Sequence, residues 1–224
     1  RACGSSVWYH PAMTLRTSDT APFLAFAAIL LAACTDAPGP SVEEVRAATS
    51  RYQSVEAALA DGYTRDPLDV CETAYYLGEL EDLGAIGVHY FRRDLLGVDE
   101  ADEMATRLAV SGIHDDFLRP ALLVYEPQPD STVQLVAIAN MVNARAWEEA
   151  GHREPPSFGE VPFAYTAGDQ TTGYPAHYHL HMWLYRDNPS GTFAPYNPAV
   201  TCAHHVFNLP AITPADSTRG APHH

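Results

Sequence analysis

Two kinds of hydrophobic periodicity run along the chain, and they predict one helix followed by several strands. Apolar residues recur at three- and four-residue steps from Val45 to Leu59, after a capping box formed by Ser41 and Glu44. This spacing predicts an amphipathic helix of roughly five turns that ends near Gly62. Further along, the apolar positions alternate or run without interruption, which is typical of strands.

The clearest strand-like runs are residues 84–90, 122–126 and 133–142. The last two flank a turn-forming stretch around Pro129, which predicts a hairpin. A short acidic helix is expected over residues 100–110, and residues 151–173 are expected to be rich in loops. The predicted fold class is α+β: an N-terminal amphipathic helix packed on a mostly antiparallel β-sheet in a single domain.

The strictest alternation begins at His177 and places His177, His179 and His181 on one face of a strand. These three histidines would span roughly 13 Å, which is too far for one metal ion unless the strand bends or bulges. We therefore expect two of them, preferably His179 and His181, to act with a residue from another segment. The candidates for that residue are His89 and Glu126.

Neutral imidazoles suit Zn, Cu or Ni, so the pattern predicts a bound Zn or Cu ion. The alternative is that the same histidines form a hydrogen-bonded sheet face that binds nothing. Two further pairs, His204-His205 and His223-His224, would at most scavenge metal incidentally.

The chain carries 13 basic and 28 acidic residues, for a net charge of −15, and all of its basic residues are arginine. Such an acidic surface repels nucleic acid and anionic lipid, so neither is expected as a partner. It favours cations, or serves only to keep the protein soluble.

The N-terminal region has the order of a bacterial lipoprotein signal: a methionine at 13, an arginine at 16, and an apolar run that ends in Leu31-Ala32-Ala33-Cys34. The run has about a dozen residues, whereas a membrane-spanning helix needs about twenty. The expected organisation is an upstream extension (1–12), a signal peptide (13–33), a tether (34–40), a globular domain (41–209) and a mobile tail (210–224). With lipid on Cys34, the protein would be exported and anchored to the outer membrane or the outer face of the cell membrane.

Two cysteines, Cys71 and Cys202, lie in the expected domain. An even pair in an exported protein usually forms a disulfide, which here would tie the start of the domain to its end. A thiolate metal site that uses Cys202 with His204 or His205 is the alternative.

Several segments together resemble a family of uncharacterised bacterial secreted proteins and lipoproteins. The segments are Gly87-Val88-His89-Tyr90, Leu123-Val124-Tyr125-Glu126-Pro127, Leu180-His181-Met182-Trp183, Asn188-Pro189-Ser190-Gly191-Thr192-Phe193 and Asn197-Pro198-Ala199-Val200-Thr201-Cys202. The resemblance implies an exported, sheet-containing protein with both cysteines in corresponding places, and no settled biochemical role. The chain departs from the family near Ala139 and near His179, where acidic residues would be expected.

Enzyme motifs are weak in this chain. His179-Leu180-His181, close to Trp183, is similar to the strand that supplies two zinc ligands in α-type carbonic anhydrases, but the match is only a few residues long. The sequence contains no Gly-rich phosphate loop, G-x-S-x-G elbow or HExxH motif. The sequence thus predicts a metal-binding lipoprotein without a definite activity. The alternatives are a structural or partner-binding envelope lipoprotein, with no particular protein partner indicated, and a zinc-dependent hydratase or hydrolase.

Overall fold

The structure is a computed structural model, and it describes residues 39–98, 107, 109–168 and 173–206. The predicted signal peptide with Cys34, most of the helix expected over 100–110, and the tail after 210 lie outside the described residues.

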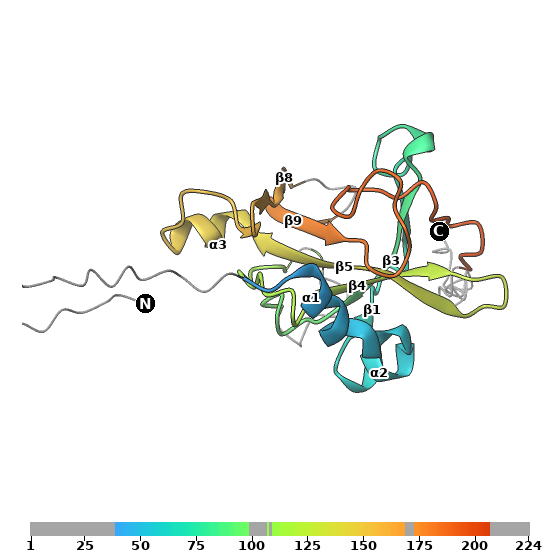
Figure 1. The fold of residues 1–224 in the computed structure, drawn as a ribbon. Helices are drawn as coiled ribbons and strands as arrows, with labels where there is room; N and C mark the ends of the chain where they lie inside the picture. Colours follow the sequence, from blue (N-terminus) through green and yellow to red (C-terminus); the bar gives the residue numbers. More distant parts are fainter. Residues whose placement is uncertain (1–38, 99–106, 108, 169–172, 207–224) are drawn as a thin grey trace, which may run out of the picture. The chain divides into compact units, whose positions relative to one another are not determined.

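A seven-stranded antiparallel sheet forms the centre of the described part (Figure 1). Its order is β1-β3-β4-β5-β9-β8, and β2 also pairs with β3. Its strands are β1 (Thr64–Arg65), β2 (Cys71–Thr73), β3 (Ala85–Phe91), β4 (Leu122–Pro127), β5 (Val133–Asn143), β8 (Ala164–Thr166) and β9 (His177–Met182). The prediction of a mostly antiparallel sheet in a single body is confirmed. A separate two-stranded sheet pairs β6 (Ser157–Phe158) with β7 (Val161–Pro162).

The hairpin predicted around Pro129 is present as β4 and β5. Both strands are buried on both faces over most of their length, which explains why their sequences are nearly continuous apolar runs. At the turn, the carboxylate of Asp130 accepts a hydrogen bond from the backbone N–H of Thr132, at 3.1 Å.

The helical segment near the N-terminus is interrupted, whereas the sequence predicts one continuous helix. It consists of α1 (Val42–Thr49), the 3-10 turn η1 (Ser50–Gln53) and α2 (Val55–Ala60). The break lies at Ser54, whose backbone is extended and whose hydroxyl accepts a hydrogen bond from the N–H of Ala57 at 3.2 Å. Serine hydroxyls compete with the helical backbone in this way, so Ser54 starts a new helix rather than continuing the first.

Several further elements were not predicted, among them the short strands β1, β2, β6 and β7. Helix α3 (Ala144–Glu149) follows β5 directly and is capped by Asn143, whose side chain accepts from the N–H of Ala146 at 2.9 Å. Strand β8 lies in the stretch that was expected to be loop, and the 3-10 turn η2 (Glu81–Leu83) precedes β3. Within the described residues, we find no helix with the length and hydropathy of a membrane span.

The two faces of the sheet have different surroundings. On one face, Leu123, Ile138 and Met182 belong to a hydrophobic cluster that also contains Val45 and Tyr52 of the helical segment. On the other face, the register aligns Phe91, Leu122, Ala139 and His181 across β3, β4, β5 and β9. This second face carries the candidate site.

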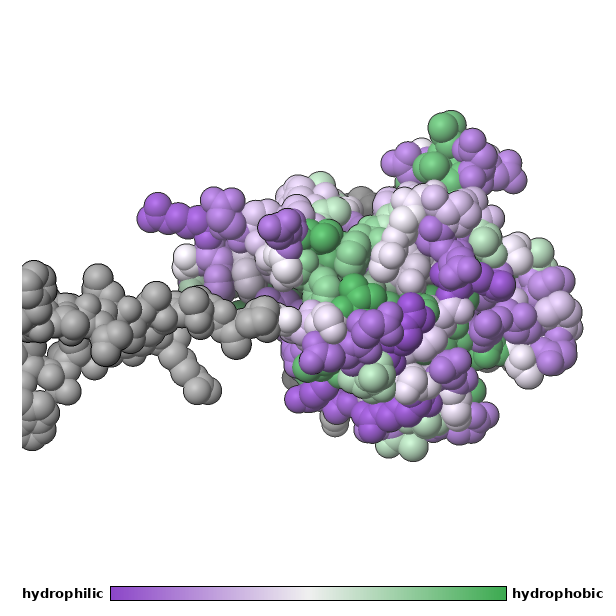
Figure 2. All heavy atoms as spheres, viewed as in Figure 1, coloured by the Kyte–Doolittle hydropathy of each residue, from purple (hydrophilic) through white to green (hydrophobic). Residues whose placement is uncertain are grey.

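The predicted disulfide between Cys71 and Cys202 is present, with the two Cα atoms 5.8 Å apart. It joins β2 to the segment after β9, and a β-bridge between Ala85 and Asn197 holds the same segment against β3. The connection between β2 and β3 projects from the body and carries exposed hydrophobic side chains, including Tyr75 and Leu80 (Figure 2).

Candidate metal centre

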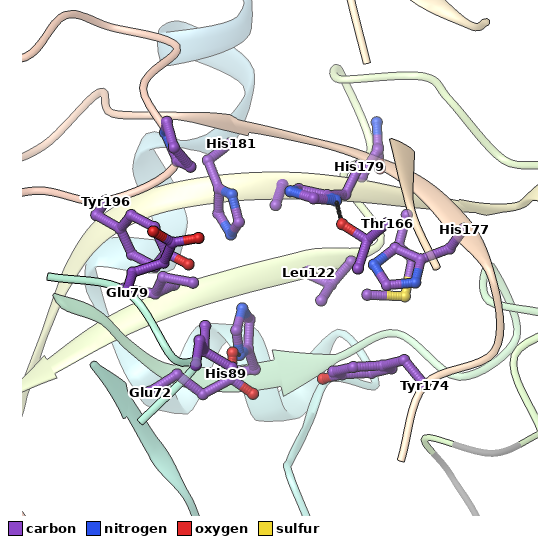
Figure 3. Close-up of a pocket in the computed structure, with 16 residues that line it drawn as sticks. Glu72, Glu79, His89, Leu122, Thr166, Tyr174, His177, His179, His181 and Tyr196 are labelled. Atoms are coloured by element: carbon purple, nitrogen blue, oxygen red, sulfur yellow. Dashed lines mark hydrogen bonds and ion pairs between the residues drawn. The ribbon is translucent and has the colours of Figure 1, made fainter. Parts of the chain in front are cut away.

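A cavity of about 240 Å³ lies on the second face of the sheet and is lined by four histidines. His177, His179 and His181 come from β9, and His89 comes from β3 (Figure 3). Glu72 of β2 lies beside His89 in the same wall. The structure therefore brings together all four histidines that the sequence singled out as the main candidates.

The four imidazole rings form a chain of neighbours. The ring centroids are 5.3 Å apart for His177 and His179, 5.6 Å for His179 and His181, and 6.1 Å for His181 and His89. Strands β3 and β9 are three steps apart in the sheet, which in a flat sheet would separate their backbones by about 14 Å. The side chains of His89 and His181 must therefore lean toward each other across the sheet face.

These separations are close to those of imidazoles that share an ion. Two imidazoles on one tetrahedral ion, with metal–nitrogen bonds of about 2.0 Å, have centroids about 5 Å apart. Within the described part of the chain, no group of three His, Cys, Asp or Glu side chains could hold a metal ion as they now stand. For the pair His89 and His181, sharing an ion would require the rings to rotate and their centroids to approach by about 1 Å, the difference from the tetrahedral value.

Burial keeps the imidazoles neutral. Burial, and then the charge of Arg107, lowers the pKa of His89 to about 4. Burial, and then the neighbouring rings of His89 and His177, lowers the pKa of His181 to about 3. Desolvation and the nearby imidazoles also lower the pKa of His179 well below its usual value. A neutral imidazole has a lone pair for a metal ion, so these groups are in the ligating form at pH 7.

Glu72 is one of two acidic residues, with Glu79, that line the cavity in the described structure, and it belongs to a buried charge network. One of its carboxylate oxygens lies 2.9 Å from the guanidinium of Arg107, which also pairs with Asp66. The other oxygen lies 3.7 Å from Nδ1 of His89. Burial raises the pKa of Glu72 to about 7, although Arg107 acts in the opposite direction.

Several buried polar atoms around the cavity make no hydrogen bond within the described structure. They are Nδ1 of His89, Nδ1 of His181, the hydroxyl of Tyr174 and Nδ2 of Asn140. The hydroxyl end of Tyr174 points toward Glu72 (Figure 3). Unpartnered buried polar groups are costly, so their concentration around one cavity indicates a space that holds an ion, a ligand or water.

Outer contacts orient two of the three β9 histidines, His177 and His179. Nδ1 of His177 lies 2.7 Å from the backbone carbonyl oxygen of Pro175, and Nδ1 of His179 lies 3.4 Å from the hydroxyl of Thr166 on β8 (Figure 3). A proton on Nδ1 of His177 that is donated to this carbonyl leaves the lone pair on Nε2. Metal-binding histidines commonly have such outer partners.

Three residues considered from the sequence lie elsewhere. Glu126 does not line the cavity; its carboxylate accepts from Arg186 and from the backbone N–H of Thr201, the latter at 3.0 Å. His205 has its Nε2 2.7 Å from the carbonyl oxygen of Asp69, and Cys202 is in the disulfide rather than in a thiolate site. We therefore leave these residues out of the candidate centre.

Sequence reasoning missed Glu72, Tyr174, Thr166 and Met141, which all line the cavity. No motif or spacing in the sequence marks Glu72 or Tyr174 as a site residue. Met141 lies in a predicted strand, and only the register shows that it faces His179.

A comparison of the chain with known protein families, with curated proteins and with solved structures finds no match. The residues of the cavity are therefore the basis for a functional conclusion.

Proposed function

We propose that this chain is an exported lipoprotein that binds a transition-metal ion, Zn or Cu, through His89, His179 and His181. The observation that carries the proposal is the convergence of neutral imidazoles from β3 and β9 on one partly closed cavity. Because these strands are not neighbours in the sheet, their pairing alone does not bring the imidazoles together.

The ligand set matches the chemistry of Zn and Cu, both of which bind imidazole nitrogen well. Three imidazoles leave one position of a four-coordinate ion for His177, for Glu72 or for water. Glu72 is also placed to accept a hydrogen bond from Nδ1 of His89, the usual role of an outer carboxylate at a metal-bound histidine.

The overall charge of the chain favours a cation, whereas the buried Arg107 beside Glu72 offsets part of the negative charge at the cavity itself. The charged side chains among the lining residues are Glu72 and Glu79, and the chain as a whole has a net charge of −15. A negative surface around a partly closed cavity raises the local concentration of cations.

The proposed location rests on the sequence and on one feature of the fold. Cys34 follows a lipobox-like stretch, and lipid on this residue would hold the protein at the outer membrane or the outer face of the cell membrane. The disulfide between Cys71 and Cys202 supports export, because such bonds persist in oxidising compartments.

Metal analysis of the protein without a histidine tag tests the site. The chain is stripped with a chelator, loaded with Zn(II), freed of excess metal and analysed by mass spectrometry for metal per chain. We expect stoichiometric zinc in the wild type and an affinity at least about 100-fold lower when His179→Ala is combined with His181→Ala.

The exposed His204 provides a matched control, because His204→Ala removes an imidazole without touching the cavity and should leave zinc binding unchanged. If the double alanine variant does not fold by circular dichroism, His179→Asn with His181→Asn replaces it. Wild-type protein that binds no metal, or a folded double variant that keeps its metal, would reject the proposal.

A further inference from the structure

A sulfur-containing side chain lies in the same wall as the β9 histidines. Met141 of β5 is paired in register with His179 of β9 and lines the cavity. Directly opposed residues have their Cβ atoms about 5 Å apart, on the same face of the sheet. A methionine side chain is long and flexible, so a rotation of its side chain can bring the thioether to an ion held in the cavity.

The thioether changes which metal the cavity suits. Imidazole alone suits Zn, Cu and Ni, whereas thioether sulfur is a soft ligand that selects Cu(I) among the common metals. Zinc sites in proteins are built from thiolate, imidazole and carboxylate, and a thioether adds little to them. A methionine among histidines is therefore a signature of copper rather than zinc.

The other donors fit the same metal. Cu(I) has a filled d shell and accepts low coordination numbers, so it does not need a complete preformed cage. In the described residues, nitrogen, carboxylate and cysteine donors do not make a group of three that could hold an ion. Met141 supplies the additional donor beside His179 and His181, whose rings are already 5.6 Å apart.

We propose that the physiological metal of this cavity is copper, and that Met141 binds Cu(I) through its thioether together with His179 and His181. This inference rests on the proposed metal function. Methionine at this position also packs against Leu122 and Ala139 in a hydrophobic cluster. The test must therefore separate ligation from packing.

Met141→Leu makes that separation, because it removes the sulfur and nearly conserves the side-chain volume. Cu(I) affinity is measured anaerobically by competition with a chromophoric Cu(I) chelator, and Zn(II) affinity by competition with a chromophoric zinc chelator, using the full chain. We expect Met141→Leu to weaken Cu(I) binding at least about tenfold and to leave Zn(II) binding within about twofold of the wild type.

Met182 is a matched control, since it lies on β9 and packs into the hydrophobic cluster on the opposite face of the sheet. Met182→Leu should leave the Cu(I) affinity unchanged. X-ray absorption of the Cu(I)-loaded wild type should show copper–sulfur scattering that Met141→Leu removes.

The outcomes distinguish the two proposals. Zinc binding that is lost with His179 and His181, combined with Cu(I) binding that Met141→Leu does not change, would overturn the copper inference and leave the metal site standing. A wild type that binds neither Zn(II) nor Cu(I) would overturn both. An equal loss of Cu(I) affinity in Met141→Leu and Met182→Leu would show a packing effect and would also overturn the copper inference.

Discussion

Ala139 lies between Leu122 and His181 in the register of the sheet, at the floor of the cavity. A methyl group at this position takes up little of the cavity, which the rings of His89 and His181 also line, with their centroids 6.1 Å apart. Among the described residues, the acidic side chains that line the cavity are Glu72 and Glu79, so the four histidines outnumber the carboxylates there.

The protonation states of the site residues should make the metal-free protein sensitive to acid. His89 and His181 have folded-state pKa values of about 4 and about 3, and an unfolded imidazole titrates near 6.5. Between these values the unfolded chain binds more protons, so the free energy of unfolding falls as the pH falls. Glu72, with its raised pKa of about 7, acts in the opposite direction between pH 7 and about 4.5, but the buried histidines outnumber it.

We expect the free energy of unfolding of chelator-treated protein to drop by about 1 kcal/mol or more per pH unit from about pH 6.5 to 4.5. Urea titrations at several pH values measure it. His181→Asn should make the slope shallower, while His204→Asn, at an exposed position, should not. A free energy of unfolding that stays constant or increases toward pH 4.5 would contradict this account of the buried imidazoles.

At the scale of elements, the cavity depends on a segment far along the chain that is held over the sheet. Pro195 and Tyr196 line the cavity, and they lie between β9 and Cys202. The disulfide to Cys71 joins this segment to β2, one residue before Glu72. The bond therefore stabilises the wall that carries Glu72 and the segment that faces it.

We expect replacement of both cysteines by serine to lower the free energy of unfolding by up to about 5 kcal/mol, because the bond closes a long loop with a sequence separation of 131 residues. Urea titration of oxidised wild type, reduced wild type and the double variant measures the loss. The free energies of unfolding of the reduced wild type and of the double variant should agree. A loss below about 1 kcal/mol would show that the loop-closure argument fails here.

At the scale of the whole molecule, the proposed anchor determines where the metal site would work. An acidic body is repelled by anionic lipid, so lipid on Cys34 rather than surface charge would hold the protein at a membrane. A tethered site of this kind would meet metal ions outside the cytoplasm.

We expect the full chain, expressed in a bacterium, to incorporate a labelled fatty acid and to sediment with membranes. Cys34→Ala should abolish the label and release the protein. Cys3→Ala is the control, because Cys3 lies in the predicted upstream extension. The Cys3→Ala protein should still incorporate the label. Label that persists in Cys34→Ala, or that is absent from the wild type, would reject the anchor.

The local pattern of apolar and polar residues was sufficient to predict several features of the architecture. Alternation places His177, His179 and His181 on one strand face, and the apolar runs on either side of Pro129 form the predicted hairpin. The pairing of Cys71 with Cys202 also followed from their number and setting. These features depend on residues close in sequence, or on a choice between few alternatives, so the sequence by itself determined them.

The tertiary structure decided the rest. It brings His89 and Glu72 to the β9 histidines and takes Glu126 away to Arg186, because strand order and register are set by packing between distant segments. Met141 faces His179 for the same reason. Strand alternation fixes which face a side chain occupies, but only the completed sheet decides which side chains from other strands share that face.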